Sequence, residues 1–92
     1  MNNDYAILTL LVKIYSVTGT AYDYSSDYTQ SIKFYLKAQS LFGKIGNVEG
    51  IGLALNNLDI TYLYTQNLDR SESCFKQAYI LGKVNWNSLD HI

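Results

Sequence analysis

Apolar and polar residues recur along the chain with the spacing of amphipathic helices. Between Asp4 and Tyr24, apolar or small residues return every three or four positions, which places them on one stripe of a helix. The same spacing recurs in three later segments, separated by short polar stretches. The pattern therefore predicts four helices, over residues 4–24, 28–44, 48–65 and from Asp69 to about Val84.

Short polar or glycine-containing stretches lie between these segments. Residues 25–27 and 66–67 carry Ser, Asp, Gln and Asn side chains, which compete for backbone hydrogen bonds and favour turns. Gly46 and Asn47 tolerate the left-handed conformation that ends many helices. Asp69 is expected to cap the fourth helix, since aspartate is a favoured N-cap residue.

The sequence repeats itself at a distance of 40 residues. Five identities fall in register, pairing Tyr22 with Tyr62, Tyr24 with Tyr64, Ser31 with Ser71, Ala38 with Ala78 and Leu41 with Leu81. Internal repetition of this length is typical of helical-hairpin arrays. We therefore divide the chain into repeat one (about 4–46), repeat two (about 47–84) and a polar tail (85–92) within a single domain.

Residue size at matched positions indicates how the helices pack. The four small residues expected to let paired helices approach closely are Ser31, Ala38, Ser71 and Ala78. Tyr35 and Phe75 are expected to fill the space between adjacent repeats. Gly50 and Gly52 each cost about 1 kcal/mol in a helix interior, so they are expected to admit a neighbouring helix.

The two copies resemble tetratricopeptide repeats, whose first helix carries a large residue, Leu-Gly and Tyr, and whose second carries a small residue, an aromatic residue and Ala. The matching residues are Tyr15, Thr18, Gly19, Tyr22, Ser31, Tyr35 and Ala38 in one copy, and Leu55, Leu58, Asp59, Tyr62, Ser71, Phe75 and Ala78 in the other. Thr18 and Asp59 depart from the Leu and Gly of the family, and the period is 40 rather than about 34. Residues 44–50 and 54–58 resemble the longer repeats of Pins-type polarity adaptors and kinesin light chains.

The resemblance implies an all-α fold of two antiparallel helix–turn–helix repeats, forming a short right-handed solenoid. In this family the first helix of each repeat lines a concave groove, where asparagines bind the backbone of a partner peptide. The corresponding residues are Asn56 and Asn57, with Leu53, Ile60 and Tyr64 on the same broad face. The alternative is that these five residues are ordinary solvated surface. Ser16 and Thr20 stand where the family's binders of acidic chaperone tails carry positive charge, so that ligand is disfavoured.

Composition and charge exclude several classes of partner. The net charge is −1 with no basic stripe, which argues against nucleic acid. The apolar run at residues 6–12 is too short to span a membrane and lacks the basic flank of a secretory signal. A single cysteine precludes an intrachain disulfide and suits a reducing, cytoplasmic location.

Catalytic chemistry has little support in the sequence. His91 is the only histidine and Cys74 the only cysteine, so no zinc-binding constellation can be assembled. Cys74 lies on a helical stripe and is expected to fill core space, since no base accompanies it. We therefore expect no enzyme activity, no catalytic residues, no metal and no cofactor.

Two functions remain open, with a third, the regulatory domain of an enzyme, if the chain is a fragment of a longer protein. The first is a non-catalytic interaction module that binds a partner peptide or helix in its concave groove. The alternative is a structural subunit, or a fragment, of a large multiprotein assembly whose faces are permanently buried. The charged fraction of 16%, against about 25% in typical domains, favours covered surfaces. Since about three repeats are usually needed for stability, we expect a longer array, self-association or a larger complex.

Overall fold

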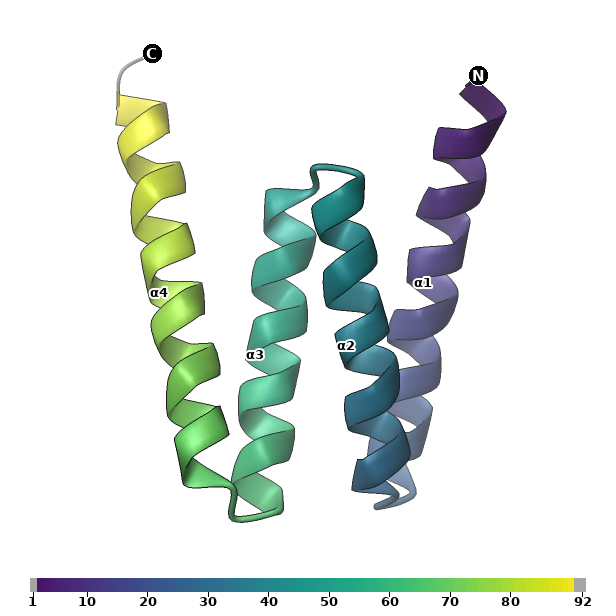
Figure 1. Cartoon of the computed structure of the whole chain (residues 1–92), viewed down its shortest axis with the longest axis vertical. Coiled ribbons are helices and arrows are strands. Elements are labelled where there is room, and N and C mark those ends of the chain that lie inside the picture. The colour runs from purple at the N-terminus through teal and green to yellow at the C-terminus, as the bar shows by residue number, and fades with distance from the viewer. Residues whose placement is uncertain (1, 91–92) are drawn as a thin grey trace.

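The chain folds into four helices that pack side by side (Figure 1). The computed structural model describes the backbone of residues 2–90 and the side chains of residues 4–84. The helices are α1 (Asn2–Tyr24), α2 (Tyr28–Lys44), α3 (Val48–Tyr64) and α4 (Leu68–Asp90), with no strand among the described residues. The all-α helical-hairpin fold predicted from the sequence is confirmed.

The predicted helix bounds agree with the structure except at the end of α4. That helix continues past Val84 to Asp90, where a polar tail was expected. Residues 85–90 contain neither Gly nor Pro, so nothing in their composition stops a helix. His91 lies outside the described residues.

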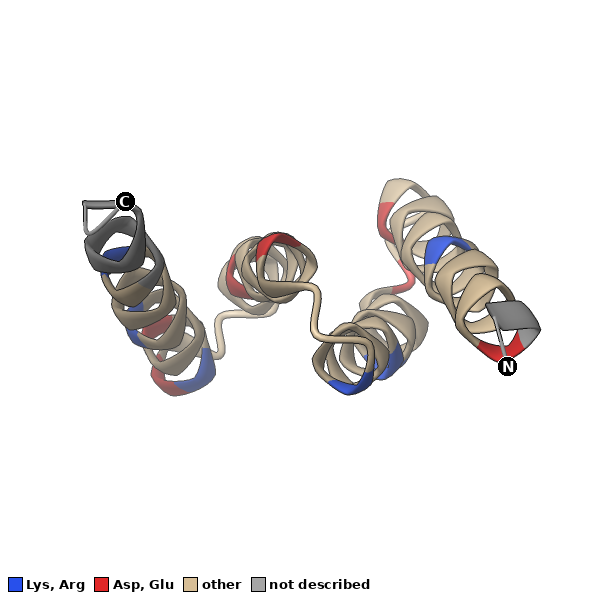
Figure 2. Cartoon of the chain, turned by 90° about the horizontal axis from the view of Figure 1, so that it is seen from above, with Lys and Arg blue, Asp and Glu red and all other residues tan. Residues whose placement is uncertain are grey.

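Each helix packs against the helix that follows it in the chain, so α2 contacts α1 and α3, and α3 contacts α4. Seen end-on, the helices alternate between two rows, with α1 and α3 in one and α2 and α4 in the other (Figure 2). The result is a thin slab of 40 × 32 × 15 Å. None of the helices described in residues 2–90 combines the length and apolarity needed to cross a membrane.

The three turns share one geometry and fall 20 residues apart. Each has a residue at positive φ in its middle position, namely Ser26 (63°), Gly46 (71°) and Gln66 (60°). The next residue then caps the following helix, its side-chain oxygen accepting from the backbone N–H three positions on; these capping residues are Asp27, Asn47 and Asn67. The prediction that Asp69 caps α4 is therefore wrong. Asn67 does so, because it directly precedes the first residue of α4 and its side chain accepts from the N–H of Arg70, whereas Asp69 lies within the first turn.

The same backbone hydrogen bond closes the turns within both hairpins. The N–H of Asp27 donates to the carbonyl of Tyr22, and the N–H of Asn67 donates to that of Tyr62, both at 2.9 Å. The donors are 40 residues apart and so are the acceptors, which matches the repeat seen in the sequence. The turn between α2 and α3 repeats this bond from Asn47 to Phe42, also at 2.9 Å.

The core consists of two clusters along the helix interfaces. One contains Tyr35, Leu55, Leu58, Tyr62 and Cys74, and the other contains Val12, Ala38 and Leu41. The small residues expected at close contacts behave accordingly, since Ser31, Ala38 and Ser71 are buried and Ala78 packs against the first cluster. Cys74 fills core space as predicted.

Phe75 does not fill the space between repeats as predicted. Its side chain is 61% exposed, whereas Tyr35, at the matched position 40 residues earlier, is 3% exposed. The reason is the position of the two helices. Tyr35 lies on α2, which α3 covers, but no described helix packs against the outer face of α4.

The two predicted close-approach glycines differ. A Cβ on Gly50 would collide with the ring of Phe42, so α2 and α3 pack tightly there. A Cβ on Gly52 would meet nothing within 4 Å, so the expectation for Gly52 is wrong. At the position of the family's glycine in repeat two, Asp59 accepts a hydrogen bond from Ser71 and thereby ties α3 to α4.

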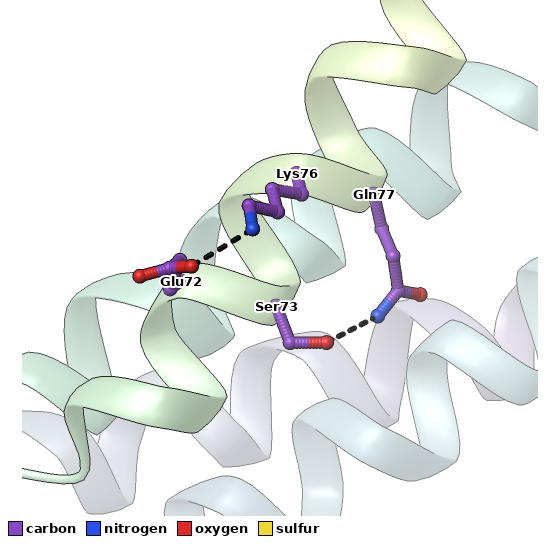
Figure 3. Close-up of polar contacts among 4 residues, drawn as sticks. All are labelled: Glu72, Ser73, Lys76 and Gln77. Atoms are coloured by element: carbon purple, nitrogen blue, oxygen red, sulfur yellow. Dashed lines mark hydrogen bonds and ion pairs between the residues drawn. The ribbon is translucent and has the colours of Figure 1, made fainter.

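The exposed surface of α4 carries pairs of polar side chains one turn apart (Figure 3). Lys76 Nζ lies 2.8 Å from Glu72 Oε1, and Gln77 donates to Ser73 Oγ at 3.1 Å. Such solvated pairs on one helix face add little stability. They mark this stripe of α4 as open to solvent.

Candidate binding groove

A groove runs between α1 and α3, above the start and middle of α2. Its volume is about 450 Å³. The residues lining it are Thr20, Asp23, Tyr24, Tyr28, Tyr35, Asn57, Ile60 and Tyr64. Helices from both repeats contribute, so the groove exists only because the hairpins are stacked.

Tyr35 of α2 contributes the most deeply buried side chain of the groove. Its ring packs on the backbone of α1 at Gly19, where the absence of a Cβ makes room for it. Its hydroxyl lies 3.1 Å from Thr20 Oγ1, within hydrogen-bonding distance. Tyr35 is therefore fixed from both ends and gives the groove a rigid base.

A pair of stacked tyrosines forms one wall. The rings of Tyr28 and Tyr64 lie 5.6 Å apart between centroids and 16° from parallel. Tyr28 is the first residue of α2 and Tyr64 the last of α3, so the stack ties the two helix ends together. Tyr24 ends α1 and is 88% exposed, which makes it the most accessible aromatic residue of the groove.

Asp23 is the one ionisable carboxyl among the lining residues. Its Oδ1 atom is enclosed and has no hydrogen-bond partner. Burial raises the pKa of Asp23 above its ordinary value of 3.8, because desolvation disfavours the charged form. An enclosed carboxylate oxygen without a donor is a group that a ligand can satisfy.

Asn57 presents a side-chain amide to the groove. The backbone carbonyl of Asn57 accepts a hydrogen bond from Thr61 Oγ1 at 2.9 Å, within α3. The amide both donates and accepts, so it can pair with the main chain of a bound segment whatever its sequence.

Three of the five residues singled out from the sequence line the groove, and two do not. Asn57, Ile60 and Tyr64 are spaced three and four apart, so they share one stripe of α3. Asn56 and Leu53 are exposed on α3 but lie outside the groove lining, since their stripe is rotated around the helix.

The other lining residues went unrecognised in the sequence analysis, although the repeat contains a signal for two of them. Tyr24 matches Tyr64 at the 40-residue distance, and Thr20 matches Ile60. These pairs lie on equivalent faces of α1 and α3. Asp23, Tyr28 and Tyr35 depend on how the helices stack, which the repeat alone does not determine.

Groups suited to metal binding or catalysis are sparse. In residues 4–84, whose side chains the structure describes, no group of three or more His, Cys, Asp and Glu residues is placed to hold a metal ion. Cys74 is buried, and burial raises the pKa of its thiol, which leaves it protonated and weakly nucleophilic.

The chain was compared with protein-family models, curated proteins and solved structures. None matches.

Proposed function

We propose that the chain is a non-catalytic protein-interaction module that holds a partner segment in the groove between α1 and α3. The single observation that supports this most is the groove itself, which is lined by four tyrosines, an amide and a carboxylate. Its volume of about 450 Å³ is within the range of known ligand sites and is large enough for a few side chains of a peptide. The resemblance to tetratricopeptide repeats and a cytoplasmic location belong to the same proposal.

Tyrosine is suited to this role. Its ring offers a large contact area with little loss of side-chain freedom, and its hydroxyl pairs with polar groups of a partner. Tyr28 and Tyr64 are stacked, and Tyr35 is held by Gly19 and Thr20, so these three rings are organised before a ligand arrives. Preorganisation lowers the entropic cost of binding.

The test is to select binders from a library of short random peptides. The wild-type chain is compared with Asn57→Ala/Tyr64→Ala, which alters the groove, and with Leu53→Ala/Asn56→Ala, which alters the neighbouring stripe of α3. We expect peptides selected on wild type to bind the stripe variant and to lose binding to the groove variant. Peptides that bind all three proteins equally, or an absence of selected peptides, would contradict a peptide-binding groove.

A second candidate function is a structural component of an assembly in which copies of the chain stack head to tail. The observation that favours it is the exposure of the outer faces of α1 and α4. Phe75 on α4 is 61% exposed, and Leu10 on α1 is also 61% exposed. At the matched positions, Tyr35 and Gly50 are buried in the contact between α2 and α3.

The two outer faces are complementary in size. Within the chain, the large Phe42 on α2 packs on the small Gly50 of α3. The residues 40 positions away are Gly82 on α4 and Leu10 on α1, so the large and small partners are exchanged. A Cβ on Gly82 would meet nothing within 4 Å, which leaves room for Leu10 of a second copy.

A second matched pair lies at the other end of these helices. The Tyr28–Tyr64 stack corresponds to Leu68 on α4 and Tyr24 on α1. Both are exposed, Leu68 at 64% and Tyr24 at 88%. If α1 of a second copy packed on α4 in the way that α3 packs on α2, Tyr24 of that copy would contact Leu68.

Sedimentation equilibrium over a range of concentrations tests this second candidate. A head-to-tail contact does not close on itself in a dimer, so the mass should rise progressively with concentration. Leu10→Glu should abolish the rise, whereas Leu53→Glu, at an equally exposed position away from both outer faces, should not. A constant monomer mass would exclude stacking of copies.

A further inference from the structure

The groove contains a carboxyl oxygen without a hydrogen-bond partner. This oxygen is the enclosed Oδ1 of Asp23, and Asp23 is the one carboxyl among the lining residues. A partly buried carboxylate gains most from a donor that is itself charged, because such hydrogen bonds are roughly twice as strong as neutral ones.

Aromatic rings surround this carboxylate. Tyr24, Tyr28, Tyr35 and Tyr64 line the same groove of about 450 Å³. The face of an aromatic ring attracts a cation through its quadrupole, and a guanidinium also stacks on the ring because it is planar and weakly hydrated. A carboxylate among tyrosines is therefore a favourable environment for a cationic side chain.

Charge is divided between the two rows of helices. The helices that flank the groove, α1 and α3, carry four acids against the single base Lys13; the acids are Asp4, Asp23, Glu49 and Asp59. The opposite row, α2 and α4, carries six of the seven bases, which are Lys33, Lys37, Lys44, Arg70, Lys76 and Lys83 (Figure 2). The row of helices that flanks the groove therefore carries a net negative charge, with Asp23 at the groove itself, and this favours approach of a basic ligand.

Some bases of α2 are directed toward rings that lie outside the groove. Lys37 Nζ lies 5.5 Å from the centroid of the Tyr15 ring and 5.3 Å from that of Phe34. Neither ring lines the groove. Lys37 therefore contacts aromatic rings outside the groove. A cation for the Asp23 carboxylate would come from another molecule.

We propose that the groove selects a basic partner segment and takes one of its arginine side chains beside Asp23. The guanidinium donates to the enclosed Asp23 oxygen and lies against the tyrosine rings, while Asn57 pairs with the main chain of the segment. This inference rests on the proposed peptide-binding function and adds the chemistry of the ligand.

The test uses defined probes and amide chemical shifts of the isotope-labelled chain. N-acetyl-arginine amide is titrated beside N-acetyl-citrulline amide, which has nearly the same shape but no charge. The variants are Asp23→Asn and, as a control with the same change in net charge, Asp69→Asn. Asp69 is exposed in the first turn of α4, in the opposite row of helices.

We expect the arginine probe to shift the amides of Thr20, Asp23, Asn57 and Tyr64 with a millimolar dissociation constant. Citrulline should bind about tenfold more weakly, which corresponds to about 1.4 kcal/mol for the lost charge. Asp23→Asn should weaken arginine binding by a similar factor, and Asp69→Asn should leave it unchanged.

Equal binding of the two probes, no loss in Asp23→Asn, or no shift at the groove would each overturn the inference. These results leave the proposed function intact if peptides selected on the wild-type chain still lose binding to the Asn57→Ala/Tyr64→Ala variant. Conversely, an absence of selected peptides would refute the proposed function even if the arginine probe binds. The two failures are therefore distinguishable.

Discussion

The ring of Tyr35 lies against the backbone of Gly19, at the point where α2 crosses the inner side of α1. A Cβ built on Gly19 would lie 2.8 Å from both Cδ1 and Cε1 of that ring, closer than real side chains approach. This contact fixes the ring that underlies the groove and places its hydroxyl beside Thr20.

Replacing Gly19 with alanine should therefore lower the free energy of unfolding. Overpacking costs about 1–3 kcal/mol and exceeds the gain in helix propensity, which is about 1 kcal/mol. Gly52→Ala is the control, because a Cβ there meets nothing within 4 Å; it should raise stability by about 0.5–1 kcal/mol. Urea denaturation measures both. Equal effects at the two positions would mean that Tyr35 does not constrain Gly19.

Truncation of the two matched aromatic residues should have unequal effects on stability. Tyr35→Ala should cost about 3–5 kcal/mol because it leaves a cavity in the core. Phe75→Ala should change the unfolding free energy by less than about 0.5 kcal/mol in dilute solution, because the side chain is exposed. Tyr35→Phe, which removes only the hydroxyl beside Thr20, should cost about 0.5–1.5 kcal/mol. A large loss in Phe75→Ala at monomeric concentrations would show that this side chain is covered.

The helices were largely predictable because their stripes and breaks depend on local sequence. Tyr28 and Lys44 bound the second helix in both the prediction and the structure. Phe75 was mispredicted for a non-local reason. Its spacing from the neighbouring small residues matches that of Tyr35, but no following helix covers it, and Asp59 stands where Gly19 makes room for the Tyr35 ring.

Glycine substitutions at the positive-φ positions of the turns should increase the stability of the chain. Ser26 and Gln66 have positive φ, which side chains with a Cβ adopt at a cost of about 1–2 kcal/mol. Ser26→Gly and Gln66→Gly should therefore stabilise the chain by about 0.5–1 kcal/mol after the greater entropy of unfolded glycine is counted. Ser40→Gly, at an exposed position within α2, should instead destabilise by a similar amount. Thermal unfolding of the three variants tests this, and a loss of stability in both turn variants would contradict the conformation described.

The groove could be predicted only in part. The stripe of Asn57, Ile60 and Tyr64 follows from helical spacing within α3, which the sequence contains. Asp23 could not be recognised as a groove residue, because the enclosure of its Oδ1 depends on how the two hairpins pack together through α2 and α3. The spacing of residues along one helix does not determine how the hairpins pack.

Asp23→Asn should leave the fold at least as stable as wild type at neutral pH. Burial raises the pKa of Asp23 in the folded chain, so the folded state holds its proton more tightly than the unfolded state. Wild-type stability relative to the variant should accordingly fall as the pH rises from about 3.8 through the higher folded value, and the penalty should vanish below that window. No second carboxyl and no base is among the other lining residues, which are four tyrosines, Thr20, Asn57 and Ile60. Urea denaturation of both proteins between acid and neutral pH measures the difference, and a relative gain with rising pH would contradict the stated environment of Asp23.

The most direct test of the groove as the working surface is to map a selected peptide by amide chemical shifts. The peptide is the one that binds wild type most tightly in the library experiment. We expect the largest shifts at Thr20, Asp23, Asn57, Ile60 and Tyr64, from both helices that flank the groove. Shifts confined to the outer face of α4, around Phe75 and Tyr79, with the groove amides unmoved, would contradict the account.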